Sequence, residues 1–174
     1  MTRAVCDSGP LTHLWQINQW QAFRTFDAIH VPEQVAREVA RHVSLAQMTA
    51  VTGRDVRVDA VSEQEIALAR QTAPANLTLH EADLATLALA RRQAPDLVLT
   101  DDLVTRQAVE AQGQTPMGSV GVLLRAYRAD FLDAVALNQA IEGLFVHSSL
   151  YLSPNFKSYV RRLIATLTDD ASTV

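Results

Sequence analysis

Short apolar runs and longer amphipathic stretches alternate along the first 118 residues of the chain. The apolar runs end near Asp7, around Val31 and near Asp102, and the segment 53–60 alternates apolar with polar residues. Runs of this length predict strands, and the helical period between them predicts connecting helices. Residues 115–118 bring the chain back to the sheet. This order is typical of an α/β fold in which helices cover both sides of a parallel sheet.

Turn residues and capping side chains indicate where the helices begin and end. A proline suits the first turn of a helix, where its missing N–H would have no partner. A serine or threonine followed three residues later by glutamate matches the capping box, and this pattern occurs twice. We expect helices from Pro10, from Pro32 through Val43, from Ser62 to Arg70 with Glu65 in its capping box, from Thr78 to Arg92 with Glu81 in its capping box, from Leu103 to Ala111 with Gly113 as its stop, from Val120 to Tyr127 with Ser119 as its cap, over 133–147, and over 154–167 with Ser153 as its cap.

Length and composition indicate a single domain over residues 1–174. The chain is 48% hydrophobic and contains no repeat, low-complexity tract or linker. We expect a core of about residues 3–128 followed by C-terminal helices over about 133–167. No apolar segment approaches the length that crosses a bilayer, and no signal-peptide pattern precedes the first strand. These features predict a cytoplasmic protein with no membrane partner.

Charge and cysteine content narrow the classes of function. The formal net charge is −4, which argues against a broad basic surface for nucleic acid and leaves only a focused site. Cys6 is the single cysteine and lies in the first apolar run, which indicates core packing and excludes a cysteine-based zinc site. The five histidines lack the spacing of a zinc motif. Among them, we expect His13 and His80 to lie nearest the candidate site.

Carboxylates follow two of the predicted strands at the point where each strand ends. Asp7 comes directly after the first apolar run, and Asp101 and Asp102 follow the run that ends at Thr100. In open α/β sheets, ligands bind beyond the carboxyl ends of the strands. Two adjacent carboxylates repel each other unless a proton, an arginine or a cation lies between them. The pattern therefore favours a metal ion at this edge.

Two further acids lie on helices where the apolar pattern is expected to carry them inward. Glu38 falls three residues after Val35, at the margin of an apolar face, and Asp83 shares a face with Leu79. An inward carboxylate needs a partner that offsets its desolvation. Together these acids form an oxygen-only set of donors, which suits Mg²⁺ or Mn²⁺ rather than zinc.

Each of these acids also has a local explanation that the sequence leaves open. A carboxylate at a strand end can cap the following helix, and a carboxylate on a helix can pair with a nearby arginine. The local explanations are a cap of the next turn for Asp7, the N-cap of the next helix for Asp102, an ion pair with Arg37 or Arg41 for Glu38, and an arginine partner for Asp83.

The order and context of several motifs resemble the PIN domain. They are the sequence Asp-Ser-Gly-Pro-Leu at 7–11, the segment 35–39 around Glu38, the helix with Ala82 and Asp83, the sequence Leu-Thr-Asp-Asp at 99–102 with Arg106, and the sequence Gly-Ser-Val-Gly-Val-Leu-Leu at 118–124. Over residues 3–165 the chain is similar to the bacterial VapC-like toxin ribonucleases of the DUF3368-like branch. Where that branch has Gly-Glu this chain has Ala-Asp, and aspartate reaches one methylene less far.

The resemblance implies a three-layer α/β/α sandwich with a central parallel sheet and a Mg²⁺- or Mn²⁺-dependent ribonuclease site. It implies Asp7, Glu38, Asp83 and Asp101 as catalytic acids, and Asp7, Asp83, Asp101 and Asp102 as metal ligands, with the choice between the last two open. Ser8, Thr100 and Arg106 are the expected supporting residues. Its implied partners are an RNA substrate, the antitoxin protein of a toxin–antitoxin pair and a second copy of the chain.

The chemistry of phosphodiester hydrolysis agrees with these residue types. The reaction needs a more acidic water and a neutralised leaving oxygen, and carboxylate-held metal ions supply both. Dehalogenase-type phosphatases need a second acid where Gly9 stands, and receiver domains need a late-strand lysine, whereas Lys157 is the only lysine. The alternative from another class is a PIN-like protein without turnover that binds a metal ion or a partner.

Overall fold

The computed structural model describes residues 1–171 and contains a five-stranded parallel sheet. Its strands are β1 (Arg3–Cys6), β2 (Ala28–Pro32), β3 (Asp55–Asp59), β4 (Leu97–Leu99) and β5 (Pro116–Met117). They lie in the order β3-β2-β1-β4-β5, and every neighbouring pair is parallel. The α/β fold predicted from the alternation of apolar runs and helices is confirmed.

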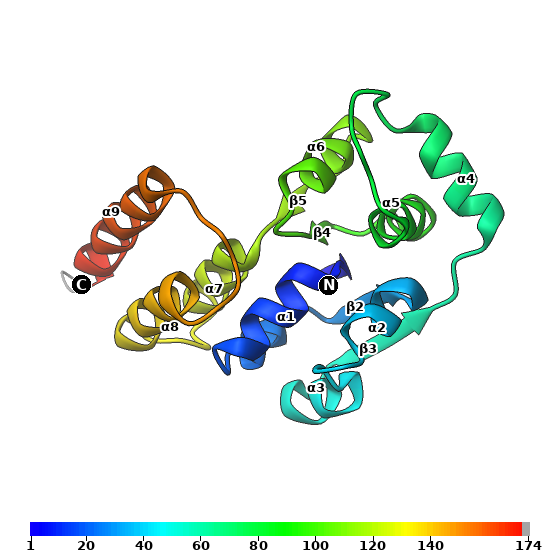
Figure 1. Ribbon diagram of the computed structural model, residues 1–174. Helices are drawn as coiled ribbons and strands as arrows, with labels where there is room; N and C mark the ends of the chain where they lie inside the picture. The colour runs from blue at the N-terminus through cyan, green and yellow to red at the C-terminus, as the bar shows by residue number, and fades with distance from the viewer. Residues whose placement is uncertain (172–174) are drawn as a thin grey trace.

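Helices connect the strands and flank the sheet, as Figure 1 shows. The helices are α1 (Ser8–Gln16), the 3-10 helix η1 (Trp20–Thr25), α2 (Glu33–Val39), α3 (Leu45–Thr52), α4 (Glu63–Thr72), α5 (Glu81–Gln93), α6 (Leu103–Ala111), α7 (Ser119–Arg128), α8 (Ala134–Val146) and α9 (Pro154–Ala171). Helices α8 and α9 lie beside α7, at the end of the molecule away from α4. Within residues 1–171, no helix combines the length and the apolar content that a membrane crossing requires.

Two hydrophobic clusters occupy the two faces of the sheet. Side chains alternate along a strand, so Ala4 and Cys6 belong to one cluster whereas Val5 belongs to the other. The first cluster contains residues from α1, η1, α2, α3, α7, α8 and α9, and the second contains residues from α4, α5 and α6. The result is the predicted layer of helices on each side of the sheet. Cys6 is completely buried, as its position in an apolar run predicts.

Several helix ends follow the predicted capping chemistry. Ser62 and Glu65 form the capping box that opens α4, and the Ser153 hydroxyl accepts a hydrogen bond from the N–H of Phe156 in the first turn of α9. Helix α6 has its predicted bounds, and Gly113 follows it with φ +72°, a left-handed conformation that glycine adopts without strain. These ends depend on contacts within a few residues, which explains why the sequence predicts them.

Other local boundaries differ from the prediction. The stretch from Pro32 to Val43 is not one helix, because α2 ends at Val39 and a new helix, α3, is capped by Ser44. Neither α3 nor η1 was predicted, since only a few of their side chains are buried and their apolar period is weak. The strand expected to reach Asp102 ends at Leu99. In these elements the strand-end acids lie in loops, Asp83 lies in the first turn of α5, and Glu38 lies in the last turn of α2.

Candidate active site

Asp7 is a buried acid at the carboxyl end of the central strand β1. It is only 3% exposed. Its Oδ1 accepts a hydrogen bond from the N–H of Ser8 at 2.7 Å, and its Oδ2 accepts one from the Thr100 hydroxyl at 2.9 Å. Asp7 is therefore the N-cap of α1, and it is also tied to the loop that follows β4.

The position of Asp7 follows from a reversal in strand order. The chain runs from β1 outward to β2 and β3, and then crosses to β4 on the other side of β1. In open α/β sheets such a reversal leaves a crevice beyond the carboxyl ends of the two inner strands, where ligands bind. Because Asp7 follows β1 while Asp101 and Asp102 follow β4, the reversal brings the predicted strand-end acids together.

Asp101 is held by side chains from two helices. His13 Nδ1 on α1 lies 2.7 Å from Asp101 Oδ2, and the Ser119 hydroxyl on α7 donates to the same oxygen at 2.5 Å. The N–H of Ser119 donates to Oδ1 at 2.7 Å. A carboxylate only accepts hydrogen bonds, so Nδ1 of His13 carries the proton. We call these contacts the Asp101 clamp, meaning Asp101 with His13 and Ser119.

The start of α7 differs from the expected one in a way that completes the Asp101 clamp. Ser119 was expected to cap α7, but Gly118 is the N-cap and Ser119 is the first helical residue. A Cβ atom on Gly118 would lie 2.9 Å from Asp101 Oδ1, so a larger residue would collide with the carboxylate.

Asp102 and Asp83 each cap a helix. Asp102 Oδ1 accepts from the N–H of Thr105 at 2.7 Å, which is the cap that the sequence left open. The capping box expected from Thr78 and Glu81 is absent, because α5 begins later, with His80 as its N-cap. Asp83 Oδ2 instead accepts from the N–H of His80 at 2.7 Å. Asp83 is half-buried in the first turn of α5. Because it accepts this hydrogen bond, it needs no arginine partner.

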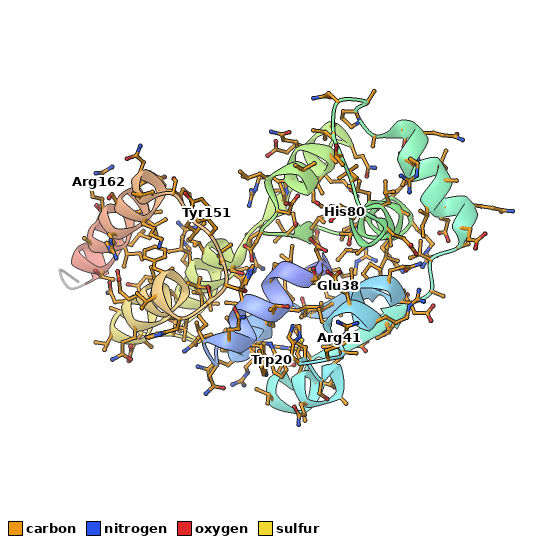
Figure 2. All side chains as sticks on the ribbon, viewed as in Figure 1. Trp20, Glu38, Arg41, His80, Tyr151 and Arg162 are labelled. Atoms are coloured by element: carbon orange, nitrogen blue, oxygen red, sulfur yellow. The ribbon has the colours of Figure 1, made fainter. Side chains whose placement is uncertain are left out.

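Glu38 on α2 is exposed, whereas the apolar pattern predicted that it would point inward. It is labelled in Figure 2. The ion pairs within the described part of the chain do not include one from Glu38 to Arg37 or Arg41. The pattern failed here because Val35 and Val39 alone form the buried face of this short helix. The carboxylate of Glu38 nevertheless remains within electrostatic reach of Asp7.

The surroundings of Asp7 disfavour its charged form. Burial raises the pKa of Asp7 from 3.8 to about 7. The hydrogen bonds from Ser8 and Thr100 lower this pKa, and the negative charges of Asp83 and Glu38 raise it again. A bound cation would offset the repulsion between this buried carboxylate and the two others.

An open cleft of about 540 Å³ lies over these acids. Its volume is in the range of sites for small ligands and single nucleotides. Figure 2 shows His80 on one side of this region and Tyr151 on the other. The residues that line the cleft are Asp7, Ser8, Gly9, His13, Thr78, His80, Asp83, Asp101, Asp102, Leu103, Val104, Ser149, Leu150 and Tyr151. Both histidines expected near the site do line it.

Three of the predicted site residues do not line the cleft. Thr100 is completely buried and reaches the site through its bond to Asp7. Glu38 lies on α2, outside the lining residues. Arg106 Nη2 lies 3.1 Å from the position that a Cβ on Gly118 would occupy, so the guanidinium is beside the Asp101 clamp. Ser8, by contrast, lines the cleft and binds Asp7 through its backbone N–H.

The carboxylate oxygens of the cleft are the kind of ligand that a hard divalent cation binds, but the side chains do not already surround one point. Among the described residues, no three His, Cys, Asp or Glu side chains already meet around a common point. Asp7, Asp83 and Asp102 each use their carboxylates in helix caps, and the caps of Asp83 and Asp102 engage one oxygen apiece. Their remaining lone pairs are the hard oxygen donors that Mg²⁺ and Mn²⁺ prefer.

Two contributors to the site were not found from the sequence. Ser119 was interpreted only as a helix cap, and its contact with Asp101 spans 18 residues of sequence. The motif at 118–124 was the one available signal for it. The segment Ser149–Tyr151 carries no motif, and only the tertiary structure places it beside Asp7.

The fold and the site define an α/β protein with an acid-lined cleft at the switch point of a parallel sheet. The chain matches the PIN-domain family DUF3368 over residues 3–166 and therefore belongs to the PIN-domain family. Proteins of this family are generally nucleases, and PIN domains typically bind divalent metals. None of the curated proteins is similar enough to the chain to give a match.

Proposed function

We propose that this protein is a Mg²⁺- or Mn²⁺-dependent endoribonuclease whose active site is the cleft around Asp7. The observation that carries the proposal is the buried Asp7 carboxylate at the switch point, with its pKa raised to about 7 and with other carboxylates around it. An uncompensated acid of this kind is costly to a fold, and such perturbed groups cluster at functional sites. Membership of a family of nucleases supports the same conclusion.

The carboxylates have different roles in this proposal. Asp7 is the central ligand, because it is buried and its two oxygens are oriented by Ser8 and Thr100. Asp83 and Asp102 complete the set with the oxygens that their helix caps leave open. Asp101 accepts three hydrogen bonds, so it serves mainly to position the residues around it.

The remaining residues act on water and on the substrate. A divalent cation at Asp7 would make a water molecule more acidic and neutralise charge on the phosphate. Glu38 is exposed and within electrostatic reach of Asp7, so it is placed to accept a proton from that water. Arg106, beside Gly118, is placed to meet a phosphate oxygen.

The proposal is tested by single-turnover cleavage of RNA with Mg²⁺, with Mn²⁺ and with EDTA. We expect cleavage with either metal and none with EDTA, and we expect Asp7→Asn to slow cleavage by about 100-fold or more. Asp130→Asn is the matched control, because Asp130 is exposed and its φ of +59° suits asparagine equally well. Cleavage by Asp7→Asn at the wild-type rate would show that the active site lies elsewhere.

The same assay, together with thermal unfolding with and without Mn²⁺, separates the nuclease from a PIN-like protein that only binds a metal ion or a partner. A protein that holds the metal without turnover would be stabilised by Mn²⁺ but would cleave no RNA under any of these conditions.

A more specific role as the toxin of a toxin–antitoxin pair is proposed on the resemblance to VapC-like proteins. The acidic cleft would accept a basic side chain of an antitoxin, and a second copy of the chain is a further expected partner. Expression should arrest growth, Asp7→Asn should not, and a neighbouring gene product should co-purify with the wild type. Normal growth and purification of the chain alone would contradict the toxin role.

A further inference from the structure

One wall of the cleft comes from a segment far from the acids in sequence. Ser149, Leu150 and Tyr151 lie between α8 and α9 and line the same cleft as Asp7 and Asp83. Tyr151 is 85% exposed, although tyrosine is a large and mostly apolar residue. Its ring therefore stands beside the acidic site without burial against the described part of the chain.

The backbone that carries Tyr151 is fixed to the helix that begins at Asp7. The N–H and the hydroxyl of Ser149 both donate to Gln16 Oε1 at the end of α1, at 2.8 and 3.0 Å. The N–H of Leu150 donates to the Ser148 hydroxyl at 3.2 Å, and the Leu150 side chain packs against the larger core cluster. The backbone that leads into Tyr151 is thus held near the acids before any ligand binds.

The charge of the cleft shows which kind of contact can hold a nucleic acid there. Four aspartates line it, and among the described residues no lysine or arginine does, so phosphate contacts to basic side chains are limited to residues beside the cleft, such as Arg106. Stacking of a base on an aromatic ring does not depend on such charge, and each stacked base contributes substantially to binding. Among the described residues that line this cleft, Tyr151 has the largest aromatic ring, and the imidazoles of His13 and His80 are the other rings.

We infer that Tyr151 is a substrate-binding residue that stacks on an unpaired base next to the phosphate at the acids. This inference rests on the proposed nuclease function and adds a residue that binds its substrate. In a duplex, the faces of the bases are already stacked on their neighbours and are not available to a side chain. A strand that places its phosphate near Asp7 and its neighbouring base over Tyr151 uses both walls of the cleft.

Single-turnover cleavage in Mn²⁺ at increasing protein concentration tests this inference. The probe is a fluorescein-labelled unstructured oligoribonucleotide, used alone or annealed to its complement, and fluorescence anisotropy of the same mixtures reports binding. We expect Tyr151→Ala to raise the half-saturating concentration for the single strand roughly 5- to 100-fold. Tyr151→Phe, which keeps the ring, should remain within about twofold of the wild type.

Two controls isolate stacking from general damage. Tyr159→Ala removes another exposed tyrosine, which lies on α9 and does not line the cleft, and it should leave binding unchanged. Because Tyr151 is exposed, Tyr151→Ala should unfold at the wild-type temperature. We also expect the wild type to bind the duplex more weakly than the single strand, and Tyr151→Ala to leave the binding of the duplex unchanged.

The outcomes separate this inference from the proposed function. If the wild type cleaves RNA but Tyr151→Ala binds the single strand as tightly, or if Tyr151→Phe is as weak as Tyr151→Ala, the stacking role is wrong and the nuclease stands. If light scattering shows a wild-type dimer that Tyr151→Ala separates, Tyr151 is a contact between copies and the inference is overturned. If the wild type neither binds nor cleaves RNA, both proposals fail.

Discussion

At the scale of single residues, the acids of the proposed site also contribute to the fold. Asp7 caps α1, Asp83 caps α5 and Asp102 caps α6. A capping carboxylate satisfies backbone N–H groups and lies at the positive end of a helix dipole. The local and the functional interpretations of these residues therefore do not exclude each other, because Asp83 and Asp102 each cap with one oxygen, and Asp7 keeps further lone pairs on both of its oxygens.

The raised pKa of Asp7 predicts how stability depends on pH in the absence of metal. The folded protein binds this proton up to a pKa of about 7, whereas the unfolded chain releases it near 3.8. The stabilisation is therefore fully present below pH 4 and is lost as the pH rises through 7. Between pH 5 and pH 8 the free energy of unfolding of the wild type should fall by an amount on the order of 2 to 3 kcal/mol from this group. The side chain of Asp7→Asn stays neutral, so this variant should not show that decrease.

Urea unfolding of wild type and Asp7→Asn in EDTA at the two pH values measures this difference. The Asn side chain can still accept from Ser8 and donate to the Thr100 hydroxyl, so the variant loses no buried hydrogen bond. We expect the variant to be the more stable protein at pH 8. Free energies of unfolding that change with pH in parallel for both proteins would contradict a raised pKa at Asp7.

At the scale of elements, the Asp101 clamp fixes α1 and α7 to the loop after β4. Each of its hydrogen bonds joins segments that are distant in sequence, since His13 is 88 residues from Asp101. If the contact with His13 is lost, Asp101 still accepts from Ser119, but the direct link from the carboxylate to α1 is gone. The clamp should therefore control how precisely the carboxyl ends of β1 and β4 meet.

Two substitutions of His13 test this control. Asparagine places an N–H donor near the position of Nδ1, whereas glutamine places its donor near the position of Nε2. We expect His13→Asn to keep cleavage within a few-fold of wild type, and His13→Gln to reduce it roughly 10- to 100-fold and to raise the Mn²⁺ concentration needed for half-maximal cleavage. Equal activities and equal Mn²⁺ requirements in the two variants would show that the contact with Asp101 has no role in the site.

The elements also show what the sequence could predict. Strands, the bounds of α6 and the capping box of α4 follow from short-range patterns, and the structure has them. The break between α2 and α3 coincides with a cap at Ser44, and the start of α5 with a cap at His80 closed by Asp83, whereas the prediction followed the apolar period and the cap pattern at Thr78. Among the site residues, the strand-end acids were predictable because the carboxyl ends of parallel strands lie at the same edge of a sheet. The contacts of Ser119 and Tyr151 were not, because they come from tertiary placement alone.

At the scale of the whole molecule, the site depends on the crossing from β3 to β4. That crossing places α4 and α5 on one face of the sheet and brings Asp83 to the same cleft as Asp7. The chain is acidic overall, with a net charge of −4, and four of its aspartates line the cleft at this edge. Repulsion among these carboxylates reduces the stability of the folded state until a cation binds.

Divalent metal should therefore stabilise the whole fold. Binding to the folded state at about 100 times the dissociation constant contributes about 2.7 kcal/mol, which for a chain of this length corresponds to a rise in melting temperature of roughly 5 to 10 °C. Because the metal must displace the proton of Asp7, the rise should be larger at pH 8 than at pH 6. Differential scanning fluorimetry with MnCl₂ or EDTA at both pH values measures it. Asp130→Asn should behave as wild type, and a shift of equal size in Asp7→Asn would place the stabilising cation away from Asp7.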